Sequence, residues 1–169
     1  MRPIKLKIKG LNSFVEEQTI DFEKLTKQGF FGIFGPTGSG KSTILDGMIL
    51  ALYGMKAMSR GTNEFVNKNC KSAQVSYEFQ ITAAQVKRYR VEREFKAGEK
   101  GTKSGKCRLL DVTDGEAVLE ESVTGVDRAC VEIIGLTADD FMRTVVLPQG
   151  KFSEFLKVSG KDRREILER

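Results

Sequence analysis

Apolar and polar residues alternate along several stretches of the chain, which is the pattern of strands with one buried face. The alternation is clearest in Ile4–Ile8, where lysines separate three apolar residues. The same pattern, or a shorter version of it, predicts further strands at 19–22, 75–81, 89–95 and 108–112, and one more after the turn 113–115. Much of the chain is therefore expected to form sheet.

A different pattern follows between residues 30 and 54. Phe30–Phe34 is continuously apolar, which predicts a strand buried on both faces. Apolar residues then recur at helical spacing from Lys41 to Tyr53, and Gly54 is suited to end that helix. The predicted unit is a buried strand, a glycine-rich turn and a helix.

Helical spacing returns toward the C-terminal end. It covers Val123–Ile134 and ends at Gly135. Thr137 and Ser159 are each followed three residues later by an aspartate, a signature of helix N-termini. The second of these caps precedes the charged segment 163–169, which predicts the first turns of a further helix.

The glycine-rich turn carries the most specific motif of the chain. Gly35–Ser42 satisfies the G-x-x-x-x-G-K-[ST] pattern between a strand and a helix, as a phosphate-binding loop requires. Inward-pointing N–H groups and the positive end of the helix dipole attract an anion there. Lys41 is expected to reach the β- and γ-phosphates of a nucleoside triphosphate, and the Ser42 hydroxyl to hold Mg²⁺. The predicted nucleotide contacts of the loop are Gly35, Thr37, Gly38, Ser39, Gly40, Lys41, Ser42 and Thr43.

Composition excludes several other chemistries. The chain has no histidine, so Ser-His-Asp and Cys-His nucleophiles and His-Glu-x-x-His metal helices are ruled out. Cys70, Cys107 and Cys130 form no Cys-x-x-Cys pair, so neither a disulfide framework nor a zinc site is indicated. No window approaches the ~18 to 20 uninterrupted apolar residues of a membrane span. These features favour a soluble protein of a reducing, cytoplasmic compartment.

The positive charge is concentrated in one segment. Lys87–Arg108 contains nine bases and three acids, a net charge of +6, whereas the whole chain carries +5. The middle of this segment, Gly98–Gly105, is predicted to be a flexible turn. Two interpretations stay open: a solvated hairpin whose lysines discourage aggregation, or a surface that contacts nucleic acid phosphates. In the second case Lys100, Lys103 and Lys106 are the candidate DNA contacts.

One part of an ATPase site is missing from the sequence. An apolar strand that ends in Asp is needed to order the metal ion and its water. Leu109-Leu110-Asp111 has only two apolar residues and follows a lysine-rich turn, so we do not assign this role to it. The phosphate loop is preceded by 34 residues, and an N-terminal segment of this kind before the loop is typical of ABC-type ATPases.

Taken together, these motifs resemble the SbcC family of ATPase subunits, relatives of the SMC proteins. The resemblance rests on Gly35–Ser42 with the following Thr43–Asp46 and Ala51–Gly54, and on Leu147–Leu156, which is similar to the family's Gln-loop. It implies an α/β fold, a P-loop head of the ABC/SMC type with a mixed parallel sheet and an antiparallel sheet. Residues 1–158 would form the N-terminal lobe of the head, and residues 159–169 would start an outgoing coiled-coil helix.

The resemblance also implies roles for individual residues. Gln149 matches the Gln-loop residue that touches Mg²⁺ and the attacking water, so Lys41 and Gln149 are the expected catalytic residues. Two further segments match nucleotide contacts of the family: Asn12 and Ser13 in the turn after the first strand, and Val66, Asn67 and Lys68 near the base.

The activity implied by the resemblance belongs to a complete head. ATP and Mg²⁺ would join two copies of the head, each made of this segment and a C-terminal half, and would control an SbcD-type nuclease on DNA ends or hairpins. The segment alone is expected to be inactive, because the signature and Asp-terminated strand motifs are absent. Two alternatives stay open: the nucleotide-binding subunit of an ABC transporter, and a nucleotide-sensing module without hydrolysis.

Overall fold

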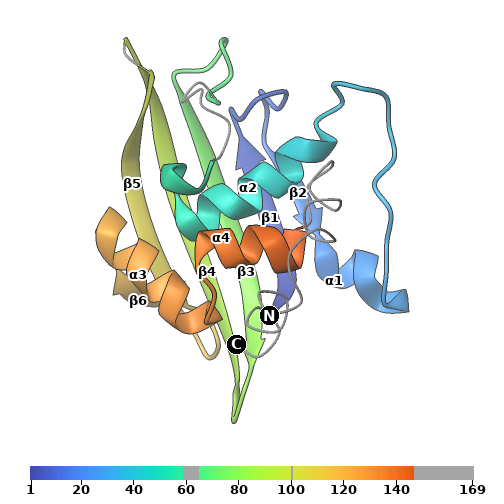
Figure 1. Cartoon of the computed structure of the whole chain (residues 1–169), viewed down its shortest axis with the longest axis vertical. Coiled ribbons are helices and arrows are strands. Elements are labelled where there is room, and N and C mark those ends of the chain that lie inside the picture. The colour runs from blue at the N-terminus through green and yellow to red at the C-terminus, as the bar shows by residue number, and fades with distance from the viewer. Residues whose placement is uncertain (59–64, 100, 147–169) are drawn as a thin grey trace, which may run out of the picture. The chain divides into compact units, whose positions relative to one another are not determined.

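The computed structural model describes residues 1–58, 65–99 and 101–146. The chain divides into two compact units, Met1–Ile134 and Gly135–Arg169. The first unit is built on a six-stranded sheet whose strands lie in the order β2-β1-β3-β4-β5-β6 (Figure 1). The strands are β1 (Arg2–Lys9), β2 (Gln18–Asp21), β3 (Ser72–Thr82), β4 (Val86–Gly98), β5 (Gly101–Asp111) and β6 (Ala117–Glu120).

One face of this sheet is covered by helix α2 (Lys41–Tyr53), which crosses the strands in Figure 1. The alternating apolar residues of the strands face it, with Leu6, Ile8 and Phe79 fully buried. A Cβ atom on Gly47 of α2 would lie 2.8 Å from Cδ1 of Ile8, so glycine at this position lets the helix approach β1 closely. The core of the first unit therefore lies between α2 and the sheet.

The remaining helices of the first unit are short or peripheral. They are α1 (Phe22–Leu25), η1 (Thr26–Gln28), η2 (Met55–Ala57) and α3 (Val123–Ile134). The bounds of α2 and α3 agree with the predicted helices, and Gly54 follows α2 with a positive φ of 66°. None of the helices in the described ranges is long and apolar enough to cross a membrane.

The second unit is described only over its first residues. It contains α4 (Ala138–Phe141) and the π-helical turn η3 (Met142–Val146). The Thr137 side chain accepts a hydrogen bond from the Asp140 backbone N–H at 3.2 Å, which confirms the predicted cap. The cap at Ser159 and the expected domain boundary at 158/159 lie outside the described residues.

The predicted strand at Phe30–Phe34 is wrong. The segment has no strand conformation, and the side chains of Phe30 and Phe34 are 83% and 93% exposed. A strand buried on both faces needs neighbouring strands and helices, and no strand in the described part of the chain pairs with it. Every strand pairing described is antiparallel, so the expected parallel sheet is not among these elements.

The flexible turn predicted at Gly98–Gly105 is also wrong. Strands β4 and β5 continue until Gly98 pairs with Gly101, and Lys96 pairs with Lys103. The glycine and serine content of the segment favours a loop, but both residue types accept extended conformations when a partner strand supplies backbone hydrogen bonds. The basic segment is therefore a long, ordered hairpin over most of its length.

Candidate functional site

The predicted phosphate loop lies between the exposed segment 30–34 and the start of α2. Gly40 is the N-cap of α2 and has a φ of 91°, and Gly38 has a φ of 85°. These left-handed conformations are available to glycine at little cost, so the loop can turn its backbone sharply into the helix. Thr37, Gly38 and Ser39 are exposed, as an anion-binding loop requires.

The ammonium group of Lys41 lies against this loop. Its Nζ donates to the carbonyl oxygens of Gly35 and Pro36 at 2.7 and 2.8 Å. Ser42 is exposed in the first turn of α2, where its hydroxyl could serve as an oxygen ligand for Mg²⁺. Thr43, in contrast, is only 5% exposed, so its side chain belongs mainly to the core beneath the loop.

The turn after β1 lies beside α2. The side-chain amide of Asn12 donates to the Asp46 carboxylate of α2 at 3.4 Å, and Asn12 has a left-handed φ of 47°. Ser13 is exposed next to it. The structure thus brings the predicted contacts Asn12 and Ser13 to the helix that carries the phosphate loop.

A third segment joins the same place from far along the chain. Leu11 and Val66 form a β-bridge, and the backbone N–H of Asn67 donates to Gly10 at 2.8 Å. The side-chain amide of Asn67 donates to the carbonyl oxygen of Asn12 at 2.5 Å. Lys68 is exposed beyond this bridge. Three separate segments that the sequence singled out therefore meet in one region.

Phe14 is a residue of this site that sequence reasoning missed. A Cβ atom on Gly40 would lie 2.6 Å from the Phe14 ring, so the ring packs directly on the last glycine of the loop. No motif marks Phe14, because a single half-buried aromatic residue in a turn is not a distinctive pattern. Two predicted residues, Gln149 and Lys100, lie outside the described residues, and their roles stay predictions.

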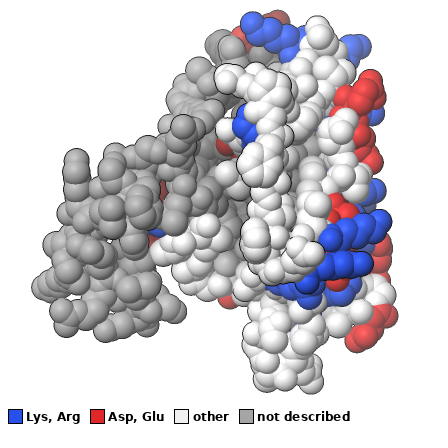
Figure 2. All heavy atoms as spheres, turned by 90° about the vertical axis from the view of Figure 1, so that its right-hand side faces the viewer, with Lys and Arg blue, Asp and Glu red and all other residues white. Residues whose placement is uncertain are grey.

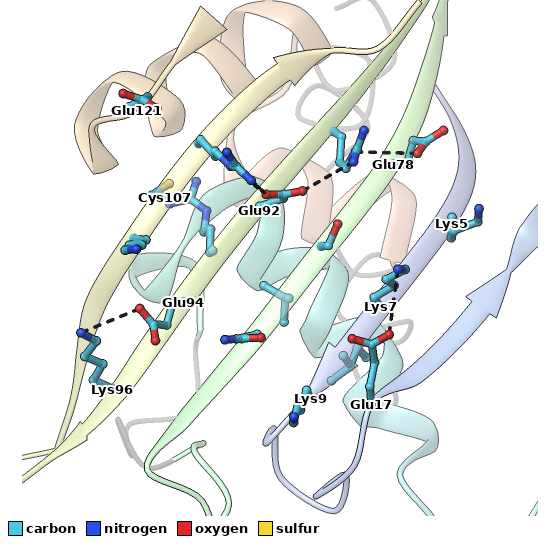
Figure 3. Close-up of a pocket in the computed structure, with 18 residues that line it drawn as sticks. Lys5, Lys7, Lys9, Glu17, Glu78, Glu92, Glu94, Lys96, Cys107 and Glu121 are labelled. Atoms are coloured by element: carbon cyan, nitrogen blue, oxygen red, sulfur yellow. Dashed lines mark hydrogen bonds and ion pairs between the residues drawn. The ribbon is translucent and has the colours of Figure 1, made fainter. Parts of the chain in front are cut away.

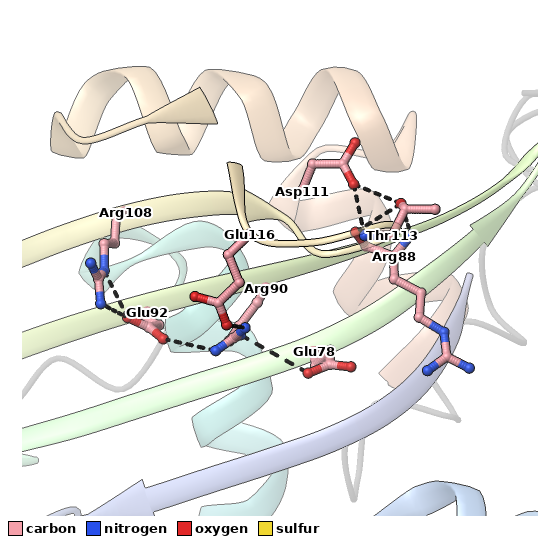
Figure 4. A network of polar contacts seen from close by, with 8 residues as sticks. All are labelled: Glu78, Arg88, Arg90, Glu92, Arg108, Asp111, Thr113 and Glu116. Carbon is pink, nitrogen blue, oxygen red and sulfur yellow. Dashed lines mark hydrogen bonds and ion pairs between the residues drawn. The ribbon is translucent and has the colours of Figure 1, made fainter. Parts of the chain in front are cut away.

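The face of the sheet opposite α2 is strongly charged. Lys, Arg, Asp and Glu side chains gather along one side of the molecule in Figure 2, and in Figure 3 several of them line an open hollow. Glu92 lies between two arginines, 3.7 Å from Arg90 and 2.8 Å from Arg108, and Arg90 also pairs with Glu116 (Figure 4). Acids therefore neutralise much of the basic segment, and the hollow is separate from the phosphate loop.

Two lysines of the β4–β5 hairpin differ from these paired arginines. Lys103 and Lys106 are exposed on β5, and neither forms an ion pair with another described residue. Lys96, opposite Lys103 on β4, lies 3.9 Å from Glu94. The ion pairs along the strands agree with the interpretation of this segment as a solvated hairpin. Lys103 and Lys106 keep the interpretation as an anion-binding surface open, because their charges are not offset by another described residue.

Asp111 has a local structural role. It accepts hydrogen bonds from the backbone N–H and the hydroxyl of Thr113, at 3.0 and 2.6 Å (Figure 4). These bonds lower the pKa of the Asp111 carboxyl, with Lys87 adding a smaller electrostatic effect. The aspartate therefore closes the turn between β5 and β6.

The chain is similar in sequence to several known proteins. A family model described as an AAA domain matches residues 5–169. The C subunit of nuclease SbcCD from Clostridium acetobutylicum is 58% identical over 172 residues, and its counterpart from Bacillus subtilis is 49% identical over 171 residues. Each alignment covers 100% of this chain and 15% of the relative, so the chain spans about 15% of the length of these relatives. The SMC head domain from Thermotoga maritima is 24% identical, with a TM-score of 0.39, over 71% of this chain and 39% of that one.

Proposed function

The chain belongs to the AAA domain family, and on this premise we propose that it is the nucleotide-binding N-terminal part of an SbcC-type ATPase head. The observation that carries the proposal is the meeting of three distant segments at the start of α2: the turn at Asn12, the phosphate loop, and the bridge at Val66. A P-loop motif alone would not require the other two segments to be there.

The residues of the loop support binding of a triphosphate with Mg²⁺. Exposed backbone at Thr37–Ser39 and the N-terminal end of α2 would hold the phosphate oxygens. Lys41 would exchange its two carbonyl partners for the β- and γ-phosphates, and the Ser42 hydroxyl would hold Mg²⁺, which neutralises phosphate charge. Gln149 would orient the attacking water, as its match to the Gln-loop implies.

The exposed apolar segment supports the idea of a C-terminal half. Burying Phe30 and Phe34 would remove two large aromatic side chains from water, which is strongly favourable. We propose that a strand from the C-terminal half pairs with Phe30–Phe34 and that the two together would form the parallel sheet of the head. ATP would then join two such heads and control a nuclease subunit of the SbcD type acting on DNA, in the cytoplasm.

The alternatives are less well supported. The relatives are named as subunits of a nuclease, which favours the SbcC-type head over a transporter subunit. The second alternative, a module that binds nucleotide without hydrolysing it, agrees with what we expect of this chain alone, namely negligible ATPase activity. Adding the C-terminal half should produce ATPase activity; a sensing module would stay inactive.

Substitution of Lys41 tests the proposed function. In the complete head, Lys41→Ala should abolish measurable binding of Mg-ATP and ATP-driven dimerisation, because the loop loses its only side-chain ammonium group. Lys27→Ala, at an exposed lysine of η1, is the matched control and should bind as the unmodified head does. ATP affinity that is equal in both variants would overturn the assignment.

A further inference from the structure

We propose that Asn67 is a positioning residue for the phosphate loop, which it supports through the Asn12 turn and the Phe14 ring. This inference rests on the proposed nucleotide-binding function. It gives Asn67 a different role from a contact with the nucleotide base, which would be the simplest interpretation of its place near the site.

The amide of Asn67 is oriented by two contacts within the protein. Its Nδ2 donates to the carbonyl oxygen of Asn12 at 2.5 Å, and its Oδ1 accepts from the backbone N–H of Asn69 at 2.9 Å. A flipped amide would place oxygen against oxygen and N–H against N–H, so these partners fix a single orientation. The amide is therefore aimed at the turn.

The segment 65–67 holds the turn from both sides. Asn12 has a φ of 47°, in the left-handed region that asparagine adopts more readily than most non-glycine residues. Its backbone N–H donates to the carbonyl oxygen of Phe65 at 2.8 Å, and the Asn67 amide donates to the carbonyl oxygen of Asn12, so the segment 65–67 fixes both peptide groups of Asn12. The Phe14 N–H closes the turn by donating to Leu11 at 2.8 Å.

The turn contacts the end of the phosphate loop through the Phe14 ring. The Phe14 ring packs against Gly40 so closely that a Cβ atom on this glycine would lie 2.6 to 3.2 Å from three ring atoms. Gly40 is the residue immediately before Lys41 and the N-cap of α2. A turn that shifts would therefore release the end of the loop whose N–H groups and lysine bind the phosphate chain.

Two isosteric, charge-matched variants of the complete head test this role. Asn67→Asp keeps the acceptor for Asn69 but sets a carboxylate against the Asn12 carbonyl, whereas Asn69→Asp adds the same charge at an exposed side chain. Binding of Mg-ATP and of inorganic tripolyphosphate, which has no base, is measured for both. We expect Asn67→Asp to weaken both ligands by the same factor, about fivefold to tenfold, and Asn69→Asp to leave both nearly unchanged.

The two ligands separate the possible outcomes. If Asn67→Asp weakens ATP but not tripolyphosphate, the residue contacts the base and the inference fails; it also fails if neither ligand changes. Should Asn67→Asp not fold, Phe14→Leu must show the same equal loss for both ligands, and an unchanged affinity there overturns the inference. If the unmodified head binds neither ligand, the proposed function itself is wrong.

Discussion

Arg93 of β4 and Asp127 of α3 form an ion pair, with Nη2 and Oδ1 2.8 Å apart, in which the arginine side chain is only 3% exposed. The same guanidinium donates from Nε to the carbonyl oxygen of Ala51 at 2.7 Å and from Nη2 to that of Leu52 at 3.2 Å. Both carbonyls lie in the last turn of α2, where backbone carbonyl groups have no hydrogen-bond donor within the helix and where the helix dipole favours a cation. One buried arginine thus fastens the helix of the phosphate loop to the sheet and to α3.

The first prediction concerns the loss of this arginine. Arg93→Met should lower the free energy of unfolding by about 3–5 kcal/mol, because Asp127 and the helix carbonyls lose their buried partner. Arg108→Met is the matched control on the neighbouring strand, where the arginine pairs with Glu92 but is half exposed, and it should change stability little. Urea denaturation measures both. Equal losses in the two variants would contradict the role assigned to Arg93.

Arg93 also illustrates what the sequence can and cannot predict. Tyr89, Val91 and Phe95 alternate along β4 and are buried, and Arg93 occupies the same face, so period-two alternation already places a charge in the core. The pattern does not identify its partners, because Ala51, Leu52 and Asp127 are distant in sequence. A charge at an apolar position of an alternating strand is thus a signal of burial that the sequence itself carries.

The helix after the phosphate loop is predicted correctly and the strand before it is not, for the same reason. The limits of α2 are predictable because its apolar spacing and its terminal glycines are local features. The composition of Phe30–Phe34 indicates burial, but it does not indicate where the partner strand lies. The described residues include no strand that pairs with this segment, and it therefore has no strand conformation there. The contact of Phe14 with Gly40 joins residues with no shared pattern, and only the fold brings them together.

The second prediction compares two glycines of the loop. Gly38 and Gly40 have nearly the same left-handed φ, but a Cβ on Gly38 would meet nothing within 4 Å, whereas one on Gly40 would meet the Phe14 ring. Both alanine variants should lose about 1–2 kcal/mol from backbone strain, and Gly40→Ala should lose about 1–3 kcal/mol more from overpacking. Urea denaturation measures each loss.

A double variant isolates the contact. In a Phe14→Ala background the extra cost of Gly40→Ala over Gly38→Ala should disappear, because the ring that causes it is gone. An excess that persists without the ring would show that Phe14 is not what the loop packs against.

The third prediction concerns a buried thiol. Burial raises the pKa of Cys130 on α3 from its ordinary value of 9.0 to about 12. Since the unfolded chain loses this proton at lower pH than the folded one, Cys130 costs the protein stability as the pH rises from about 9 toward 12. Between pH 9 and 10.5 the unmodified chain should lose about 1.5 kcal/mol more stability than Cys130→Ala. Cys70→Ala, at a half-exposed thiol, is the control, and a pH dependence that Cys130→Ala does not reduce would contradict the prediction.

The fourth prediction concerns DNA. Lys103 and Lys106 project from the β4–β5 hairpin without ion pairs to described residues, whereas acids offset the arginines of the same segment. If the hairpin contacts phosphates, replacing both lysines with alanine in the complete head should weaken DNA binding and reduce the slope of log affinity against log salt by up to about one unit per lysine. The control variant replaces Lys27 of η1 and Lys56 of η2 with alanine, which removes the same amount of positive charge from another part of the chain. An equal reduction in both double variants would mean that only net charge matters, and an unchanged slope would leave the hairpin as a solvated surface.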